Sequence, residues 1–162
     1  MRRLSVLLLV TLAALLAGPS AQAAEVYHER VPVDDRFVND QSCGFPVEVH
    51  ITGVAIIIEQ HGNDGSFRLF VGQPQIKATM TNLDTGKTIT VNISGPLHIT
   101  EQPDGSFTAV ETGLWARRVN PETGEAGLFL AVGRRISTVD AEGNESVQFV
   151  GHVIDLCAEL AA

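Results

Sequence analysis

The chain shows a strict alternation of hydrophobic and polar residues over short segments. Residues 47–52, 76–81 and 88–93 each place an apolar side chain at every second position, with charged or polar residues between them. A period of two with many β-branched residues is typical of an antiparallel strand that has one face on the core and one face in water. The pattern therefore predicts an all-β protein.

Glycines in turn-forming clusters divide the chain at regular intervals. One series lies at positions 65, 86, 105, 124 and 143, and a second series lies between them at 53, 72, 95, 113, 133 and 151. Turn signals at this spacing are typical of a meander, a sandwich or a barrel of about eight to ten strands. Because the alternation continues in phase through Gly95, we expect some glycines of the second series to mark bends inside long strands.

A short repeat, NDGSF at 63–67 and PDGSF at 103–107, has the composition of a turn. A calcium loop would need further spaced carboxylates, which neither copy has. Asp-Gly between alternating segments indicates a hairpin, because glycine accepts the positive φ of the turn and aspartate caps its backbone. We expect Phe67 and Phe107 to start the following strands and to face inward.

The fold that we expect is an antiparallel up-and-down meander closed into a barrel of about eight strands, because closure removes the exposed sheet edges. The strand after Cys43 would pair with the strand before Cys157 at the seam. A β-sandwich is the alternative. The barrel domain would span 43–162, preceded by an extended N-terminal arm at 24–42, and VIDLCAELAA at 153–162 would form a short terminal helix.

Two segments, 54–58 and 128–132, are apolar on both faces. Exposing them would forgo ~1.5–3 kcal/mol for each large apolar side chain. The arm, the C-terminal segment or a second copy of the chain must therefore cover their outer faces. We expect a homo-oligomer that forms through these outer residues: Val54, Ile56, Ile58, Phe129 and Ala131.

The N-terminus predicts export. Arg2 and Arg3 precede an apolar run at 4–17, and Ala21-Gln22-Ala23 is a small-x-small cleavage site, so residues 1–23 are predicted to be a secretory signal peptide. The run is shorter than the ~20 residues of a spanning helix, and Pro19 stands where a lipoprotein would have cysteine, so we expect no membrane anchor. The predicted location is extracellular, or periplasmic in a host with an outer membrane.

The two cysteines of the chain, Cys43 and Cys157, both follow the predicted cleavage site. In an oxidising compartment an even pair without C-x-x-C spacing predicts one structural disulfide. Without the signal peptide, 9 Lys and Arg face 19 Asp and Glu, a net charge of −10. Such an acidic chain is not expected to bind nucleic acid or anionic membranes.

Few residues indicate chemistry. The histidines are not paired at metal-ligand spacing, so we expect surface positions for His28, His50, His61 and His98, and packing at the seam near Cys157 for His152. No G-x-S-x-G, H-E-x-x-H or P-loop occurs, and we assign no catalytic residue, metal or cofactor.

Six further residues have structural explanations. Asp155 is predicted to be a turn cap, and Trp115 is predicted to fill core volume. Adjacent strand residues point to opposite faces, so neither Arg117-Arg118 nor Arg134-Arg135 should form an anion clamp, and surface charge is the expected role of each pair.

Four stretches carry a resemblance: CGFPVEVHITG (43–53), NISGPLHI (92–99), GLFLAVGR (127–134) and VIDLCAEL (153–160). The chain resembles a group of small exported bacterial proteins of unassigned function, each with one cysteine before the first strand and one near the end. The architecture is similar in outline to the eight-stranded barrel of allene oxide cyclases and dirigent proteins. A fold does not carry a function with it, and no cyclase catalytic residue maps onto this chain.

Three functions follow as hypotheses. The first is a secreted barrel that binds a small apolar ligand or a partner. The second is a cyclase or isomerase that uses the barrel cavity, and the third is a structural or interaction protein with a filled core. An open cavity with convergent polar groups would favour the first two hypotheses, and a filled core would favour the third.

Overall fold

The computed structural model describes residues 25–162. The predicted signal peptide, residues 1–23, and its cleavage site lie outside the described residues. The described chain is all-β apart from one short helix, as the alternation predicted, and it has nine strands, within the predicted range. The strands and the helix are β1 (Glu25–Asn39), β2 (Val47–His61), β3 (Phe67–Gly72), β4 (Lys77–Asn82), β5 (Thr88–Asn92), β6 (Leu97–Glu101), β7 (Phe107–Val119), β8 (Ala126–Val139), β9 (Glu145–Asp155) and α2 (Leu156–Ala161).

All nine strands belong to one antiparallel sheet, which is not closed into a barrel. Its order is β5-β4-β2-β3-β6-β7-β8-β9, and β1 pairs with β2. Within residues 25–162 no ladder joins β2 to β9, so the seam that we expected between the strands next to the cysteines is not formed. The predicted N-terminal arm is a strand for most of its length, because β1 pairs with β2 from Glu25 to Asn39.

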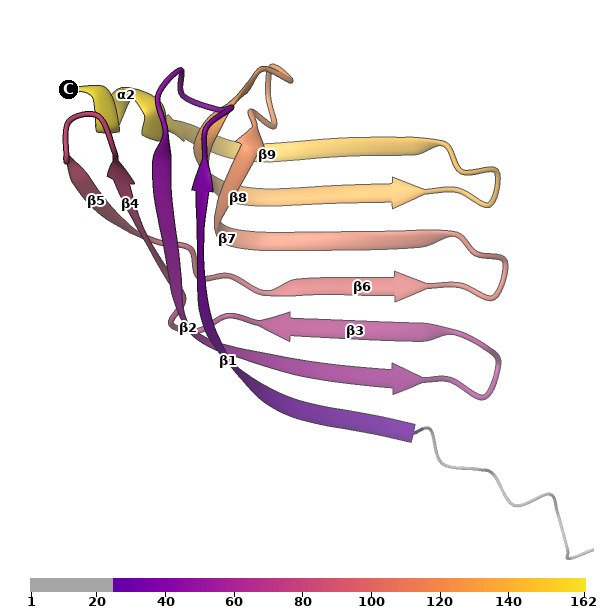
Figure 1. Cartoon of the computed structure of the whole chain (residues 1–162). Coiled ribbons are helices and arrows are strands. Elements are labelled where there is room, and N and C mark those ends of the chain that lie inside the picture. Colours follow the sequence, from indigo (N-terminus) through magenta and orange to yellow (C-terminus); the bar gives the residue numbers. More distant parts are fainter. Residues whose placement is uncertain (1–24) are drawn as a thin grey trace, which may run out of the picture.

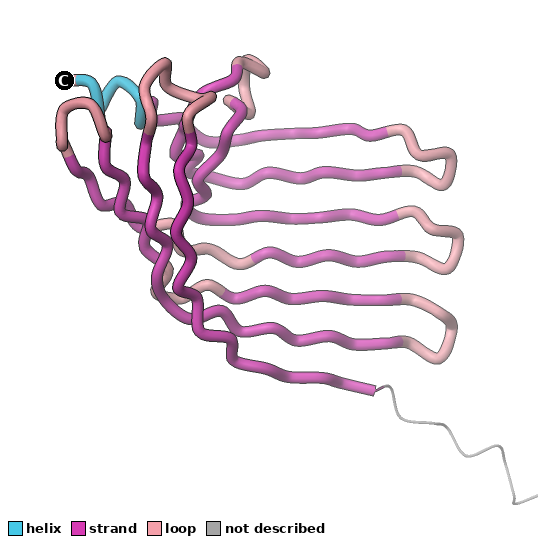
Figure 2. The backbone as a smooth tube through the Cα atoms, in the orientation of Figure 1, coloured by secondary structure: helices cyan, strands magenta, loops and turns pink. Residues whose placement is uncertain are grey.

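The sheet has two differently shaped ends (Figures 1 and 2). At one end seven strand segments lie side by side in a single layer, which we call the flat end; it comprises 25–31, 55–61, 67–72, 97–101, 107–112, 134–139 and 145–150. At the other end the sheet divides. The first leaf comprises 33–39 of β1, 47–52 of β2, β4 and β5, and the second leaf comprises 114–119 of β7, 126–132 of β8 and 152–155 of β9.

Strands that lie in one layer at the flat end lie in two facing layers at the two-leaf end, because the strands twist along their length. The core-cluster residues of β2 in the first leaf, Val47 and Val49, have odd numbers, whereas those of β8 in the second leaf, Leu128 and Leu130, have even numbers. Partners across every ladder of the flat end share the same parity, so these residues belong to opposite faces of one sheet. A right-handed twist of each strand brings those opposite faces into contact.

Glycines lie where the long strands turn from one end to the other. Gly113 of β7 pairs with Gly133 of β8, which pairs with Gly151 of β9. Gly113 has φ +102°, and a Cβ atom there would lie 2.7 Å from the carbonyl oxygen of Ser94. The second glycine series therefore includes bends inside strands, as expected, because only glycine permits this backbone angle and this close approach.

The repeated NDGSF and PDGSF segments form hairpin turns, as predicted. Gly65 and Gly105 both have φ +84°. The Asp64 carboxylate accepts hydrogen bonds from the backbone N–H and the hydroxyl of Ser66, at 3.0 and 2.6 Å. Asp104 and Ser106 repeat this arrangement at 2.9 and 2.7 Å. These hydrogen bonds, first from the hydroxyl and then from the N–H, lower the pKa of Asp64 and of Asp104.

The hydrophobic core lies between the two leaves, and α2 closes it. Met80 of the first leaf and Leu130 of the second leaf belong to the same buried cluster as Leu156 and Leu160 of α2. Asp155 caps the helix by accepting a hydrogen bond from the N–H of Ala158 at 3.0 Å, which confirms its predicted role. The predicted disulfide is also present, and Cys43–Cys157 fastens the β1–β2 connection to this helix.

Candidate functional site

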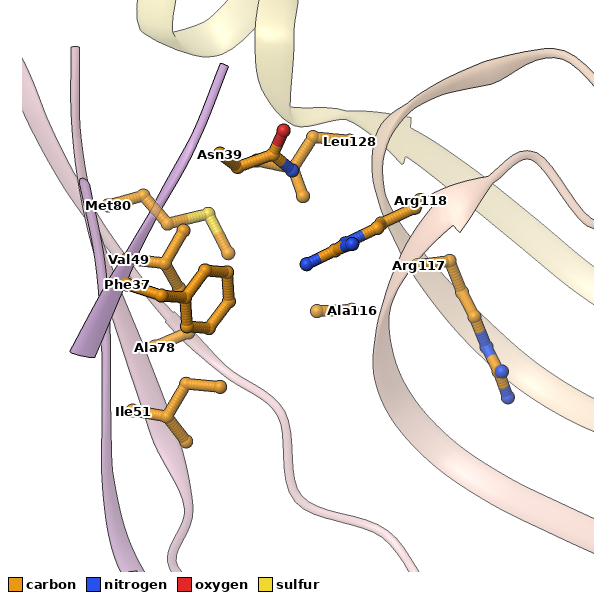
Figure 3. A pocket seen from close by; sticks show the side chains of 10 residues that line it. All are labelled: Phe37, Asn39, Val49, Ile51, Ala78, Met80, Ala116, Arg117, Arg118 and Leu128. Carbon is orange, nitrogen blue, oxygen red and sulfur yellow. The ribbon is translucent and has the colours of Figure 1, made fainter. Parts of the chain in front are cut away.

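A pocket opens between the two leaves, beside the core (Figure 3). The first leaf contributes side chains from β1, β2 and β4, and the second leaf contributes side chains from β7 and β8. Its volume is about 130 Å³, and its lining is Phe37, Asn39, Val49, Ile51, Ala78, Met80, Ala116, Arg117, Arg118 and Leu128. It is smaller than the roughly 300–1,000 Å³ of typical ligand sites.

The two adjacent arginines of β7 point in opposite directions (Figure 3), which confirms that they do not form a clamp. Arg118 points toward the first leaf, with its guanidinium carbon 5.7 Å from the centre of the Phe37 ring. Arg117 points away and pairs with Glu111. Asn39 is already engaged, because its Oδ1 accepts from the N–H groups of Gln41 and Ser42 at 3.2 Å.

A partly buried ion-pair cluster lies on the far side of the second leaf and continues into the flat end. The Glu111 carboxylate pairs with Arg117 and lies 3.5 Å from Nη1 of Arg135. The other terminal nitrogen of Arg135, Nη2, lies 3.7 Å from the Glu145 carboxylate. The expected role of surface charge is therefore wrong for Arg117 and Arg135. Their shared carboxylate was missed because the Glu111–Arg135 pairing requires the strand register.

Trp115 is not part of the hydrophobic core, contrary to our expectation. Its indole N–H donates to the carbonyl oxygen of Thr112 at 3.1 Å, and Arg117 lies 5.7 Å from its ring centre. Trp115 has an odd number, and on β7 the even-numbered residues Leu114 and Ala116 pack against the core. The side chain therefore lies on the outer side of the second leaf.

The histidines occupy exposed or half-buried positions, in agreement with the prediction for His28, His50, His61 and His98. His152 is exposed, so its expected packing at a seam is wrong. His50, on the outer side of the first leaf, has both ring nitrogens hydrogen-bonded: Nε2 to Asp34 at 2.7 Å and Nδ1 to Arg36 at 3.1 Å. Because a guanidinium only donates, Nδ1 accepts and Nε2–H donates. Neither nitrogen is left to act as a base. Within residues 25–162 no three His, Cys, Asp or Glu side chains gather as a metal site.

The flat end has two chemically different faces. Since partners across its ladders share parity, its odd-numbered residues form one face and its even-numbered residues form the other; we call these the odd face and the even face. The odd face is mainly apolar through its centre, and its larger members are Ile57, Phe67, Leu69, Val71, Leu97, Ile99, Phe107, Val139, Val147 and Phe149. Phe67 and Phe107 thus lie on the same face, but outside the core cluster.

Charge is segregated between the same two faces. The odd face carries six carboxylates and only one arginine, Arg135; the carboxylates are Glu25, Glu29, Glu59, Glu101, Glu111 and Glu145. Within the described strands the even face has no carboxylate, and it carries Arg30, Arg68 and Arg134. Among the described residues no ion pair joins these three arginines to an acid, whereas Arg117 and Arg135 both have acidic partners.

The two segments that are apolar on both sides lie in different surroundings. Val54, Ile56 and Ile58 continue along the even side of β2 and are half-buried. Phe129 and Ala131 are only 7% and 6% exposed within the single chain, on the outer side of the second leaf. These two residues therefore offer little surface to a second copy, because the chain's own side chains already cover them.

Comparison with protein-family models, with curated proteins and with solved structures finds no match to this chain. The resemblance to small exported bacterial proteins stays a prediction. Among the described residues, no helix has the length and apolar character needed to cross a membrane. The Cys43–Cys157 disulfide is compatible with an extracellular or periplasmic location.

Proposed function

We propose that this is an exported structural protein whose copies stack through their flat ends, the odd face of one copy on the even face of the next. The observation that carries this proposal is a one-layer sheet with an apolar, acidic face and a basic face without acids. This chemistry favours the third of our three hypotheses, a structural or interaction protein.

Burial of apolar area supports stacking. Within residues 25–162 no other element lies over the flat end away from the bend (Figures 1 and 2), and only Ala55 and Val71, next to the bend, contact the core cluster. Seven strands at about 4.8 Å spacing and five or six residues of about 3.3 Å each give a face on the order of 600 Å². Stable interfaces bury roughly 800 Å² per partner, so this face is slightly below the standard size. Its apolar centre is at the upper end of the roughly 300–600 Å² patches found on soluble monomers, and patches of that size often mark interaction sites.

Charge decides which faces meet. Two odd faces would bring two sets of carboxylates together, and two even faces would bring two sets of arginines together. An odd face on an even face places Glu59 and Glu101 of one copy against a surface that carries Arg68 and Arg134. Opposite charges across an interface favour this pairing, and like charges oppose the other two.

Such an interface is heterologous, because each copy uses two different surfaces. Each copy then leaves one odd and one even face free at the ends, so the assembly extends as an open stack. Val54, Ile56 and Ile58 contribute to it from the even side of β2. The proposal retains the homo-oligomer predicted from the sequence but changes its interface. The odd face is added to the interface, and Phe129 and Ala131 are removed from it.

Two charge-reversal variants test the proposal. Glu59→Lys with Glu101→Lys damages the odd face, and Arg68→Glu with Arg134→Glu damages the even face. Each variant alone should be monomeric in sedimentation velocity, because each has lost one of the two required surfaces. An equimolar mixture should form a dimer and stop there, since only one pair of undamaged faces remains.

Lys87→Glu is the matched control, because it reverses a charge on the β4–β5 turn, away from both faces, and should assemble like the unaltered chain. Dimerisation of the even-face variant alone would contradict stacking and indicate odd-on-odd pairing. Undiminished assembly of both variants would indicate contact through the strand edges.

The other two hypotheses are less well supported. The hypothesis of a ligand-binding barrel has less support, because the sheet is not closed into a barrel. The cyclase or isomerase hypothesis has less support, because the pocket between the leaves is lined by no Asp, Glu or His.

A further inference from the structure

We infer that the pocket between the two leaves binds a small carboxylate with an apolar body, and that Arg118 holds the carboxylate. This inference does not depend on stacking, because the pocket belongs to the two-leaf end. It also differs from the interior barrel cavity expected from the sequence, because the site lies between two sheet layers and has a charged group beside it (Figure 3).

The apolar part of the pocket sets the size of the ligand. Phe37, Ile51 and Met80 line it from the first leaf, and Ala116 and Leu128 line it from the second leaf. Its volume of about 130 Å³ is close to that of an engineered apolar cavity of about 150 Å³ that takes up benzene. One aromatic ring or a short acyl chain therefore fits, and Met80 can adapt its shape to either.

Arg118 sets the charge of the ligand. The face of Phe37 holds the guanidinium by a cation–π contact, which leaves its N–H groups free to donate. The planar fork of N–H donors matches the two oxygens of a carboxylate. No carboxylate of the described chain pairs with Arg118, in contrast to Arg36, Arg117 and Arg135.

The remaining polar lining groups do not compete for this role. Arg117 points away from the pocket and is neutralised by Glu111. The side-chain amide of Asn39 donates to the hydroxyl of Ser42 at 2.9 Å, and its oxygen accepts from the backbone. Arg118 is a single cationic group next to an apolar pocket, so the site selects a monocarboxylate over an amine, whose positive charge Arg118 would repel.

The test is an NMR titration of the full exported chain with benzoate and hexanoate, using benzyl alcohol and hexanol as neutral probes of the same shape. Both acids should shift signals of pocket residues, and the matching alcohols should bind more weakly. Arg118→Gln should weaken binding of the acids about ten-fold or more, because it removes a charge-assisted bidentate contact. Lys87→Gln, a change on the β4–β5 turn outside the pocket lining, should leave their binding unchanged.

Two further measurements separate the contributions of charge and shape. Ala116→Leu fills the pocket and should abolish binding of both acids while Arg118 stays in place. Binding should also fall below about pH 4–5, where the ligand carboxyl gains a proton and arginine stays charged. The inference is overturned if neither acid shifts the pocket signals. It is also overturned if Arg118→Gln, folded by its circular dichroism, binds acid and alcohol as the unaltered chain does.

Discussion

The flat end and the two-leaf end are made largely from the same strands, yet only one of them encloses a core. β2, β7 and β8 run through both ends, and at the flat end their odd-numbered side chains share one face while their even-numbered side chains share the other. At the two-leaf end the twist stacks the layers, and α2 and the disulfide close them. At the flat end the same alternation leaves an apolar face without a covering layer.

This difference shows that alternation determines which side chains share a face, and that the position of a second layer determines whether that face is buried. Within one chain, the second layer forms only beyond the glycine bends. Stability should therefore be concentrated at the two-leaf end, and association should be concentrated at the flat end. Four sets of variants test this division, in order of decreasing effect.

Loss of the disulfide should have the largest effect. Cys43→Ser with Cys157→Ser removes a link across 114 residues, and the free energy of unfolding should fall by roughly 4–5 kcal/mol because the unfolded chain gains entropy. Urea denaturation of the variant and of the oxidised chain measures the change. Equal midpoints and slopes would show that the link between β1–β2 and α2 does not stabilise the two-leaf end.

Truncation of leucine should affect the two ends differently. Leu160→Ala creates a cavity in the core, where the side chain is 0% exposed, and should cost roughly 2–5 kcal/mol. Leu69→Ala makes the same chemical change on the odd face and should cost a dilute single chain less than about 1 kcal/mol, because its surroundings remain partly open. Equal losses in thermal unfolding at low concentration would contradict the division between the ends.

Substitution of a bend glycine should have an intermediate effect. Gly113→Ala forces a side chain onto φ +102° and toward the carbonyl oxygen of Ser94, so we expect a loss of roughly 1–3 kcal/mol. Gly105→Ala is the matched control, since it also has a positive φ but open space around the position of a Cβ. Its cost should be smaller, about 1 kcal/mol. If Gly105→Ala costs more in urea denaturation, the close approach at the bend is unimportant.

The hairpin carboxylates should have the smallest effect. Hydrogen bonds from Ser106 lower the pKa of Asp104 in the folded chain, so their stabilisation is present above the unfolded value of about 3.9 and is lost as pH falls through the folded value. Ser106→Ala should raise the pKa of Asp104 in an NMR titration, with little change in stability because the turn is exposed. Ser146→Ala is the control and should leave the pKa of Asp104 unchanged. If the pKa of Asp104 does not rise in Ser106→Ala, the hydrogen bonds from Ser106 are not the cause of its lowering.

The features that sequence predicted are those decided by neighbours along the chain. Alternation identified the strands, Asp-Gly identified the turns at Gly65 and Gly105, and Asp155 was identified as a cap. The disulfide was also predictable, because two cysteines allow one pairing. The bends inside long strands were predicted in part, because the alternation of apolar and polar residues continues through Gly95.

The features that sequence missed depend on register and on twist. The carboxylates and the arginines lie on opposite faces, and this separation is visible only when the register of the seven strands is known. With that register, odd and even residue numbers identify the two faces. Twist placed Arg118 beside a pocket and Trp115 outside the core, and no local pattern encodes that rotation. The barrel was expected because closure removes edges, but the sheet instead divides into two leaves.

The most direct test of stacking is the mass of the unaltered exported chain in solution as a function of concentration. In sedimentation velocity we predict a mean mass that rises from one chain at low-micromolar concentration to several chains at high-micromolar concentration, without a limiting dimer. Glu59→Lys with Glu101→Lys should remain at the mass of one chain throughout. A folded, unaltered chain that keeps the mass of one copy over the whole range would contradict the account.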